Sequence, residues 1–154
     1  MPDRTDSDEN PNLHILVGYD GSPPADRALE AAVRLLQGRS GDIHVSYVAH
    51  VPSVDLMSAD AIVEVEEGFD EIEKDLRASA AALLDGRRIT WKFQRRQGQI
   101  VQELIAAASA VTENHPGDTV AIVVGSSSSA SHRIIGSVAV GLARHCHVPV
   151  MIVP

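Results

Sequence analysis

The chain has 154 residues, of which 44% are apolar and 22% charged, and Cys146 is its one cysteine. This length fits one globular domain rather than two, and a single cysteine excludes both an intrachain disulfide and a two-cysteine metal knuckle. Its 13 Lys and Arg against 21 Asp and Glu give a net charge of −8, which argues against nucleic-acid binding because a polyphosphate needs a basic surface.

The N-terminal segment changes character at residue 13. Residues 1–12 are polar and include four acids, which predicts a disordered tail followed by one domain over residues 13–154. Residues 13–17 form a mostly apolar run that predicts a buried strand ending in a Gly-Tyr-Asp-Gly-Ser loop. A helix is expected next, because a serine cap and two prolines precede apolar residues at three- to four-residue spacing: Ser22, Pro23, Pro24, Ala25, Ala28, Leu29, Ala32, Val33 and Leu36.

A second strand and a long acidic helix follow. Apolar residues between 43 and 51 predict the strand, which Pro52 closes. Residues 55–75 hold nine acids against one lysine, so this stretch alone carries a charge of −8. Apolar residues recur at helical spacing among the acids, which predicts a helix with its acids in water and one face on the core: Ile62, Val65, Phe69, Ile72, Leu76 and Leu83.

The second half of the chain again alternates strands with helices. Residues 89–94 alternate strictly between apolar and polar side chains, which indicates a half-exposed strand at a sheet edge. Periodicity then predicts a helix over 100–111, a buried strand over 120–124, a helix over about 136–145 and a last strand from Val148 to Val153. The whole pattern predicts an α/β fold, in which a parallel sheet is covered by helices on both faces.

Neither a membrane span nor a signal peptide is expected. No apolar run approaches about 18 residues, and the N-terminus lacks the apolar stretch that a signal peptide needs. We therefore expect a cytosolic protein that does not enter membranes.

Two of the expected strand ends carry small and polar residues. In a parallel sheet, ligands bind beyond the carboxyl ends of the strands, where the strand order reverses. Residues 20–22 (Asp-Gly-Ser) follow the first strand, and a serine-rich loop over 125–133 follows the fourth, before Gly136 and Ser137 open a helix. Small residues let backbone amides approach an anion, and a helix N-terminus favours negative charge. The loop is either a phosphate cradle, to which Arg133 adds a charge, or a flexible surface loop.

Other candidate sites have weaker support. The sequence contains no G-x-x-x-x-G-K-[ST], no G-x-G-x-x-G and no G-x-S-x-G. His145-Cys146-His147 is a poor metal site, because three consecutive side chains point in different directions. His50 follows the second strand and could contact a ligand. The basic pairs Arg87-Arg88 and Arg95-Arg96 flank the third strand, and we expect them to be solvated.

The Asp-Gly-Ser turn at 20–22, the segment GSSSSASHRIIGSVAVGLARHCHVPVMIVP and the five-strand alternation resemble the universal stress protein family over residues 13–154. The resemblance implies an adenine-nucleotide alpha-hydrolase-like, Rossmann-like fold with strand order 3-2-1-4-5 and four helices. It also implies a stress-response module that binds ATP or another adenine nucleotide. Asp20 and the backbone of Val48 would face the adenosine, and the rest of the implied site would face ribose and phosphates: Gly125, Ser126, Ser128, Ser129, Gly136, Ser137 and Val138.

The loop departs from the ATP-binding branch of that family, where it reads G-x2-G-x9-G-[ST]. Gly125 matches the first glycine and Gly136-Ser137 the last pair, but Ser128 stands at the second glycine and the loop is two residues shorter. Glycine adopts φ > 0 readily and lets phosphates lie close, so we expect weak ATP binding that Ser128→Gly improves. Two alternatives stay open: a protein-interaction scaffold without a nucleotide, and a slow ATP hydrolase that uses Asp20 and Mg²⁺.

The last expected strand bears on assembly. Val148 to Val153 is apolar on both faces, although the implied strand order puts it at a sheet edge. An exposed apolar edge invites pairing, and family members are expected to form dimers through this strand about a two-fold axis. The alternative is a monomer whose edge is covered by residues 1–12, which are too polar to do this well. We expect the homodimer.

Overall fold

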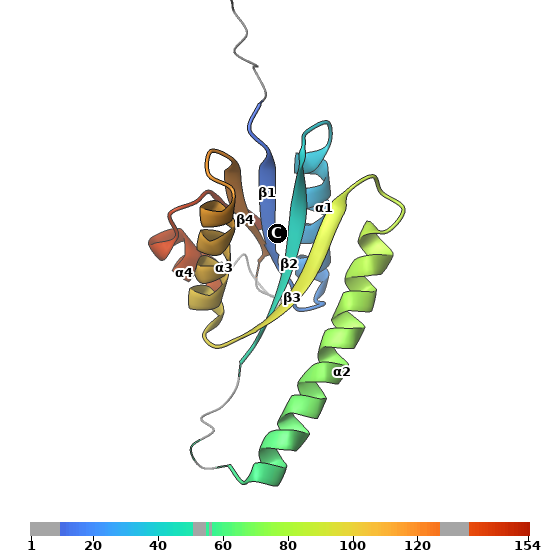
Figure 1. Cartoon of the computed structure of the whole chain (residues 1–154), viewed down its shortest axis with the longest axis vertical. Coiled ribbons are helices and arrows are strands. Elements are labelled where there is room, and N and C mark those ends of the chain that lie inside the picture. The colour runs from blue at the N-terminus through green and yellow to red at the C-terminus, as the bar shows by residue number, and fades with distance from the viewer. Residues whose placement is uncertain (1–9, 51–54, 56, 127–135) are drawn as a thin grey trace, which may run out of the picture.

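The structure is a parallel α/β sandwich. The computed structural model describes residues 10–50, 55, 57–126 and 136–154. Within these ranges, the five strands form one sheet in the order β3-β2-β1-β4-β5, with helices on both faces (Figure 1). The predicted fold class and strand order are therefore confirmed. The elements are β1 (Leu13–Gly18), α1 (Pro23–Leu36), β2 (Gly41–Ala49), α2 (Ala59–Leu84), β3 (Thr90–Gln97), α3 (Ile100–Asn114), β4 (Thr119–Gly125), α4 (Ser137–His145) and β5 (Val150–Val153).

The sheet separates two apolar cores. Side chains alternate along each strand, so one set faces α1 and α2 while the other faces α3 and α4. Ile15 and Val17 of β1 pack with Leu29 in the first core, whereas Leu16 packs with Leu104 and Leu142 in the second. Both faces of β1 are buried, which explains why its sequence is an apolar run rather than an alternating one.

Helix α1 follows the sequence prediction closely. Ser22 has extended backbone angles, and its Oγ accepts a hydrogen bond from the Ala25 N–H at 3.4 Å. Pro23 begins the helix, where a missing N–H costs nothing. All the apolar positions predicted for the core face, from Ala25 to Leu36, are buried.

Helix α2 corrects the prediction of one continuous core face. Its 26 residues span about 39 Å, whereas the nine residues of β2 span about 30 Å. The first half of α2 therefore extends past the strands (Figure 1). Only Ala80 and Leu84 are fully buried, and Leu76 packs partly against the core, but Ile62 and Ile72 are 38% and 43% exposed.

Strand β3 lies at the sheet edge, as its alternating pattern predicted. Its Arg95 is not a free surface cation, contrary to the expectation from sequence. The guanidinium lies 3.3, 2.7 and 3.6 Å from carboxylate oxygens of Glu66, Asp70 and Glu73 on α2. A hydrogen bond to Asp70 is the main reason why the pKa of Arg95 is raised. Part of the acidity of α2 thus holds that helix to β3.

The chain ends differ from the prediction in detail. Asn12 was assigned to the polar tail, but its N–H and its Nδ2 donate to the two Asp118 carboxylate oxygens at 3.1 and 3.2 Å. Strand β5 begins at Val150 rather than Val148, since the preceding Pro149 has no N–H to give to the sheet. None of the helices in the described part of the chain is both long and apolar enough to cross a membrane.

Candidate functional site

A pocket of about 230 Å³ lies at the carboxyl ends of β1, β2 and β4, where the strand order reverses. The N-termini of α1 and α4 close two of its sides. The structure brings together seven of the nine positions that the sequence analysis singled out: Asp20, Val48, Gly125, Ser126, Gly136, Ser137 and Val138. The other two, Ser128 and Ser129, lie outside the described residues, as does Arg133.

The turn after β1 is held by its own polar groups. An Asp20 carboxylate oxygen accepts a hydrogen bond from the Ser22 N–H at 3.0 Å, which is an Asx turn. Gly21 has φ +77°, and a Cβ there would come within 2.6 Å of Leu76 Cδ2. The residue between Asp20 and Ser22 is therefore glycine for two reasons, its backbone angle and the packing of α2.

Gly125 has a packing role that the sequence analysis did not predict. Its expected role, to let the backbone approach an anion, stays a prediction. A Cβ at Gly125 would meet the backbone of Pro24, at 2.5 Å from both its carbonyl carbon and its oxygen. The glycine thus allows the end of β4 to pass close to the start of α1, and this approach forms one wall of the pocket.

The N-terminus of α4 offers backbone donors to the pocket. Gly136 is the N-cap residue, with φ −63° and ψ 159°, and it provides no side-chain cap. The first helical residues after it line the pocket: Ser137, Val138 and Ala139. Their N–H groups have no partner within the helix, and the positive end of the helix dipole lies at the same point. This is an arrangement that favours an anion.

Several pocket residues escaped the sequence analysis. Tyr19 is 3% exposed, and its hydroxyl donates to Asp26 Oδ1 at 2.8 Å. Burial, and then this hydrogen bond to a carboxylate, raises the pKa of Tyr19. Ser46 is buried in β2 and accepts a hydrogen bond from Gln94 Nε2 at 2.9 Å. The strand-end rule could have found Tyr19 and Ser46, because each lies within two residues of a predicted site position.

The apolar residues that line the pocket could not have been identified from the sequence. Ile100 and Leu104 line the pocket from the first turns of α3, and Tyr47 lines it from β2. Burial raises the pKa of Tyr47, although the nearby Arg95 opposes the shift. In sequence, Ile100 and Leu104 have the same helical spacing as ordinary core residues, so nothing marks them as pocket residues.

The remaining candidates lie elsewhere. His50 is exposed and lines a neighbouring surface hollow with Gln99 and His145, outside the pocket. Two triads of potential metal ligands have donor atoms within 4.8 Å of one another in the described chain. Both are centred on His14, and neither includes Cys146 or its histidine neighbours.

The chemistry of the pocket suits a ligand with an apolar or planar part and an anionic part. Asp20 is the single carboxylate among the described lining residues, and no described lining residue is a cation. Hydroxyls and the N–H groups at the start of α4 provide donors, while Val48, Ile100 and Leu104 provide apolar surface.

Comparisons with known proteins agree with this architecture. Residues 11–154 match the model of the universal stress protein family. No curated protein matches the chain in sequence. Among solved structures, the hypothetical protein MJ0577 has a TM-score of 0.74 at 18% identity, covering 91% of this chain and 94% of its own.

Two further structures contain ligands. A universal stress protein in complex with cAMP has a TM-score of 0.61 at 24% identity, covering 92% of this chain and 97% of its own. The universal stress protein from Archaeoglobus fulgidus in complex with dAMP has a TM-score of 0.54 at 18% identity, covering 95% of this chain and 99% of its own. At such identities these structures show the shared fold.

Proposed function

The chain belongs to the universal stress protein family, and from that premise we propose that it is a cytosolic adenine-nucleotide-binding module with a regulatory role in stress. The observation that carries this proposal is the pocket at the β1/β4 reversal, where seven of the positions implied by the resemblance lie around the N-terminus of α4, which has no side-chain cap. The cAMP and dAMP complexes of two structural relatives support the ligand class.

The described pocket accommodates only part of the proposed ligand. The volume of about 230 Å³ is below the range of about 300–1,000 Å³ of sites that enclose a drug-sized ligand. We infer that the described walls hold the nucleoside, with Asp20 and the Val48 backbone facing the adenosine. The phosphates would extend toward the N-terminus of α4 and the Ser126 end of the loop.

Binding is favoured over catalysis. Phosphoanhydride hydrolysis needs an activated water and a positioned metal, and Asp20 is the one acidic side chain in the described lining. One of its oxygens already accepts the Ser22 N–H. The slow Asp20 and Mg²⁺ hydrolase and the nucleotide-free scaffold are therefore the alternatives against which the proposal is tested.

The first test is a thermal-shift panel with ATP, ADP, AMP and cAMP, followed by an ATP turnover assay. We expect at least one adenine nucleotide to raise the melting temperature, because a ligand that binds only the folded state stabilises it. A melting temperature that no nucleotide changes would favour the scaffold, and several turnovers per minute would favour the hydrolase.

A charge substitution tests where the phosphates lie. Ser137 is exposed at the start of α4, and Ser137→Glu places a negative charge there. The charge favours the helix dipole, so the fold should be retained, but it should repel a phosphate and weaken nucleotide binding at least tenfold. Ser79→Glu, on the exposed side of α2, adds the same charge away from the pocket and should leave affinity unchanged. Equal affinities in both variants would remove α4 from the proposed site.

We also propose that the chain forms a homodimer through β5. In the described chain, β5 pairs with β4 on one side and is the last strand of the sheet. Its Met151 is 40% exposed, and the other three residues are half-buried. A two-fold contact between two such edges would cover this apolar strand.

The dimer is tested by light scattering. The unmodified protein should have about twice the 16.4 kDa mass of one chain, and Met151→Lys should shift it toward the monomer. Val63→Lys is the matched control, because Val63 is 55% exposed on α2. A monomeric mass for the unmodified protein at micromolar concentration would reject the dimer.

A further inference from the structure

A polar cluster lies at the amino ends of the strands, at the opposite end of the sheet from the pocket. In the β1–β2 register His14 and Asp42 are direct partners, and His44 follows on the same face of β2 as Asp42. His14 and Asp20 are separated by six residues, about 20 Å of extended chain. Burial is nearly complete for the two imidazoles, with side chains 6% and 3% exposed, while Asp42 is 19% exposed.

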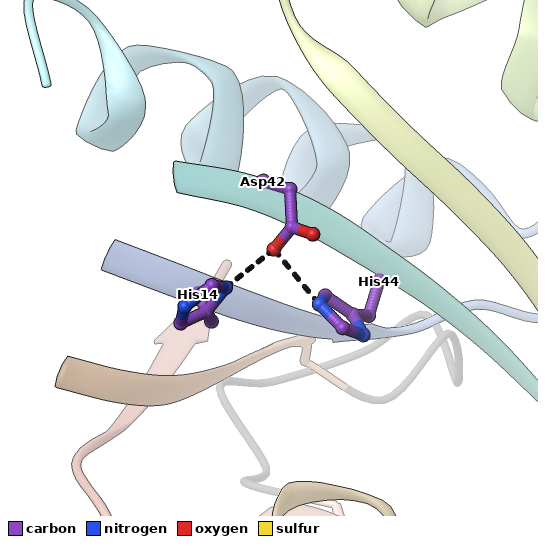
Figure 2. Close-up of side chains that lie close together, drawn as sticks. All are labelled: His14, Asp42 and His44. Carbon is purple, nitrogen blue, oxygen red and sulfur yellow. Dashed lines mark hydrogen bonds and ion pairs between the residues drawn. The ribbon is translucent and has the colours of Figure 1, made fainter. Parts of the chain in front are cut away.

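The three side chains converge on one point. Asp42 Oδ1 lies 2.7 Å from His14 Nδ1 and 2.8 Å from His44 Nε2 (Figure 2). The two rings meet edge to face, with an interplanar angle of 86° and centroids 6.0 Å apart. Two imidazole nitrogens thus lie within hydrogen-bond distance of the same carboxylate oxygen. This gives two nitrogen ligands and one oxygen ligand from three separate side chains.

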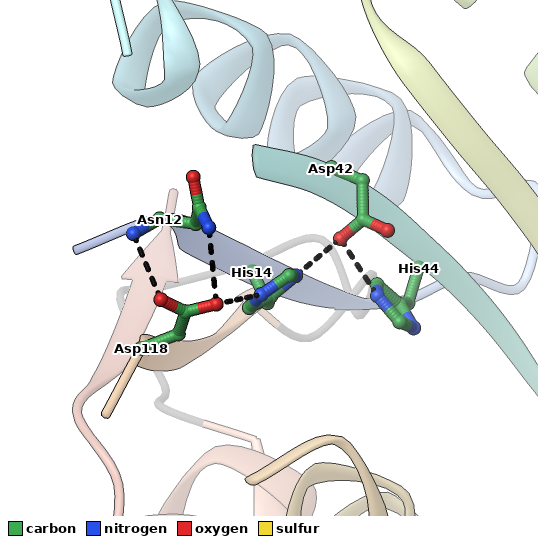
Figure 3. A network of polar contacts seen from close by, with 5 residues as sticks. All are labelled: Asn12, His14, Asp42, His44 and Asp118. Carbon is green, nitrogen blue, oxygen red and sulfur yellow. Dashed lines mark hydrogen bonds and ion pairs between the residues drawn. The ribbon is translucent and has the colours of Figure 1, made fainter. Parts of the chain in front are cut away.

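The second ring nitrogen of His14 contacts another carboxylate. His14 Nε2 lies 3.0 Å from Asp118 Oδ2, and Asp118 in turn accepts two hydrogen bonds from Asn12 (Figure 3). A histidine that ligates a metal typically donates its other ring N–H to a carboxylate, which fixes the ring and makes it a stronger ligand. Asp118 has this position relative to His14.

From this geometry we propose that His14 Nδ1, His44 Nε2 and an Asp42 carboxylate oxygen bind a divalent first-row transition-metal ion, with Asp118 positioning His14. Two imidazoles and a carboxylate match the ligand preference of Zn²⁺ and its neighbours, and a solvent molecule through the exposed part of Asp42 would complete the coordination. The ion would replace the protons that now join the three groups. His14 would release its Nδ1 proton to solvent, and His44 would carry its proton on Nδ1.

The change in geometry that this needs is small. Ligand atoms around a tetrahedral ion with bonds of about 2.0 Å are about 3.3 Å apart. The present separations of 2.7 and 2.8 Å would have to widen by about 0.5 Å. Lys92, the register partner of His44 on β3, is the adverse charge beside the site. Asp42 and Asp118 together offset it.

The alternative triad around His14 is less suitable. His115 and Asp118 also lie near His14, but the rings of His14 and His115 are tilted only 30° from parallel, with centroids 4.1 Å apart. The lone pairs of two imidazoles stacked in this way lie in two separate, nearly parallel planes, so they converge poorly on one ion. The geometry therefore assigns Asp118 to the positioning role.

The proposal is tested by titrating the metal-free, full-length protein with Zn²⁺ in a calorimeter. We expect one equivalent to bind, less tightly at acid pH because protons compete for the same nitrogens. His44→Gln keeps a hydrogen-bond donor for Asp42 but removes the imidazole, and it should weaken binding at least tenfold. The double variant His145→Gln/His147→Gln is the matched control, since both side chains are exposed beside Cys146. It should bind Zn²⁺ as the unmodified protein does.

Two further measurements keep the test decisive if His44→Gln does not fold. Asp118→Asn should weaken Zn²⁺ binding about 10- to 100-fold, and it should alter the visible spectrum of bound Co²⁺. The Co²⁺ spectrum of the unmodified protein should show nitrogen and oxygen ligands without a thiolate charge-transfer band. The absence of saturable binding, loss of binding in the double variant, or a thiolate band from Cys146 would each overturn the proposal.

Discussion

Gly125 provides the sharpest test of how the pocket is built. A Cβ at this position would lie 2.5 Å from the carbonyl carbon and oxygen of Pro24, and 2.6 Å from its Cβ. Two of these atoms belong to the backbone, so the clash cannot be relieved by rotating a side chain. The N-terminus of α1 would have to move away from β4. Insertion of one methyl into a packed contact of this kind costs about 1–3 kcal/mol.

The perturbation is Gly125→Ala, measured by urea unfolding and thermal melting without any added ligand. For a protein of this size, about 1–3 kcal/mol corresponds to a fall in melting temperature of about 2–12 °C. Gly68→Ala is the matched control, because a Cβ at Gly68 meets nothing within 4 Å and alanine favours the interior of α2. It should raise stability by about 0.5–1 kcal/mol. If Gly125→Ala is as stable as the unmodified protein, the packing role assigned to this glycine is wrong.

Four further substitutions test the packing of the helices and the ionisation of Tyr19. Leu84→Ala should lower the free energy of unfolding by about 2–5 kcal/mol, because Leu84 is fully buried. Ile72→Ala should change it by less than about 0.5 kcal/mol, because Ile72 is 43% exposed. Urea unfolding of both variants compares them. Arg95→Met should cost about 1 kcal/mol at low salt and less at about 1 M salt, since three partly exposed ion pairs are lost and salt screens such pairs. Because the folded pKa of Tyr19 is raised, its contribution is present below the ordinary tyrosine pKa of about 10 and declines as the pH rises through the higher folded value. Tyr19→Phe should therefore show a smaller loss of melting temperature above about pH 10 than the unmodified protein, and an equal loss in both proteins would contradict this assignment.

The sequence pattern correctly predicts those elements whose burial is uniform along their length. The apolar run of β1, the capped stripe of α1 and the alternation of β3 each reflect one environment along the whole element, so periodicity identifies them. It fails on α2, because a periodic stripe does not show how long the supporting sheet is. Ile62 and Ile72 keep the helical spacing of core residues but are 38% and 43% exposed.

The candidate pocket was predictable for a topological reason. Parallel strands place all their carboxyl ends at one edge, so Asp20 and Gly125 must meet once β1 and β4 are neighbours. The role of an individual residue in the pocket was harder to predict. Gly125 fits both a phosphate loop and a close approach of β4 to α1, and the sequence pattern is the same for both.

The His14 cluster could not be predicted from sequence spacing. His14, Asp42 and Asp118 are distant in the chain, and none of them stands in a recognisable ligand spacing. Their meeting depends on a register in which His14 faces Asp42 on one side and Val120, two residues after Asp118, on the other. A shift of one residue would turn His14 to the opposite face of the sheet, among the apolar side chains beneath α1. The register that buries the apolar side chains therefore also places two carboxylates beside the His14 imidazole. Strand β1 connects this cluster to the pocket, because it ends at Gly18, two residues before Asp20.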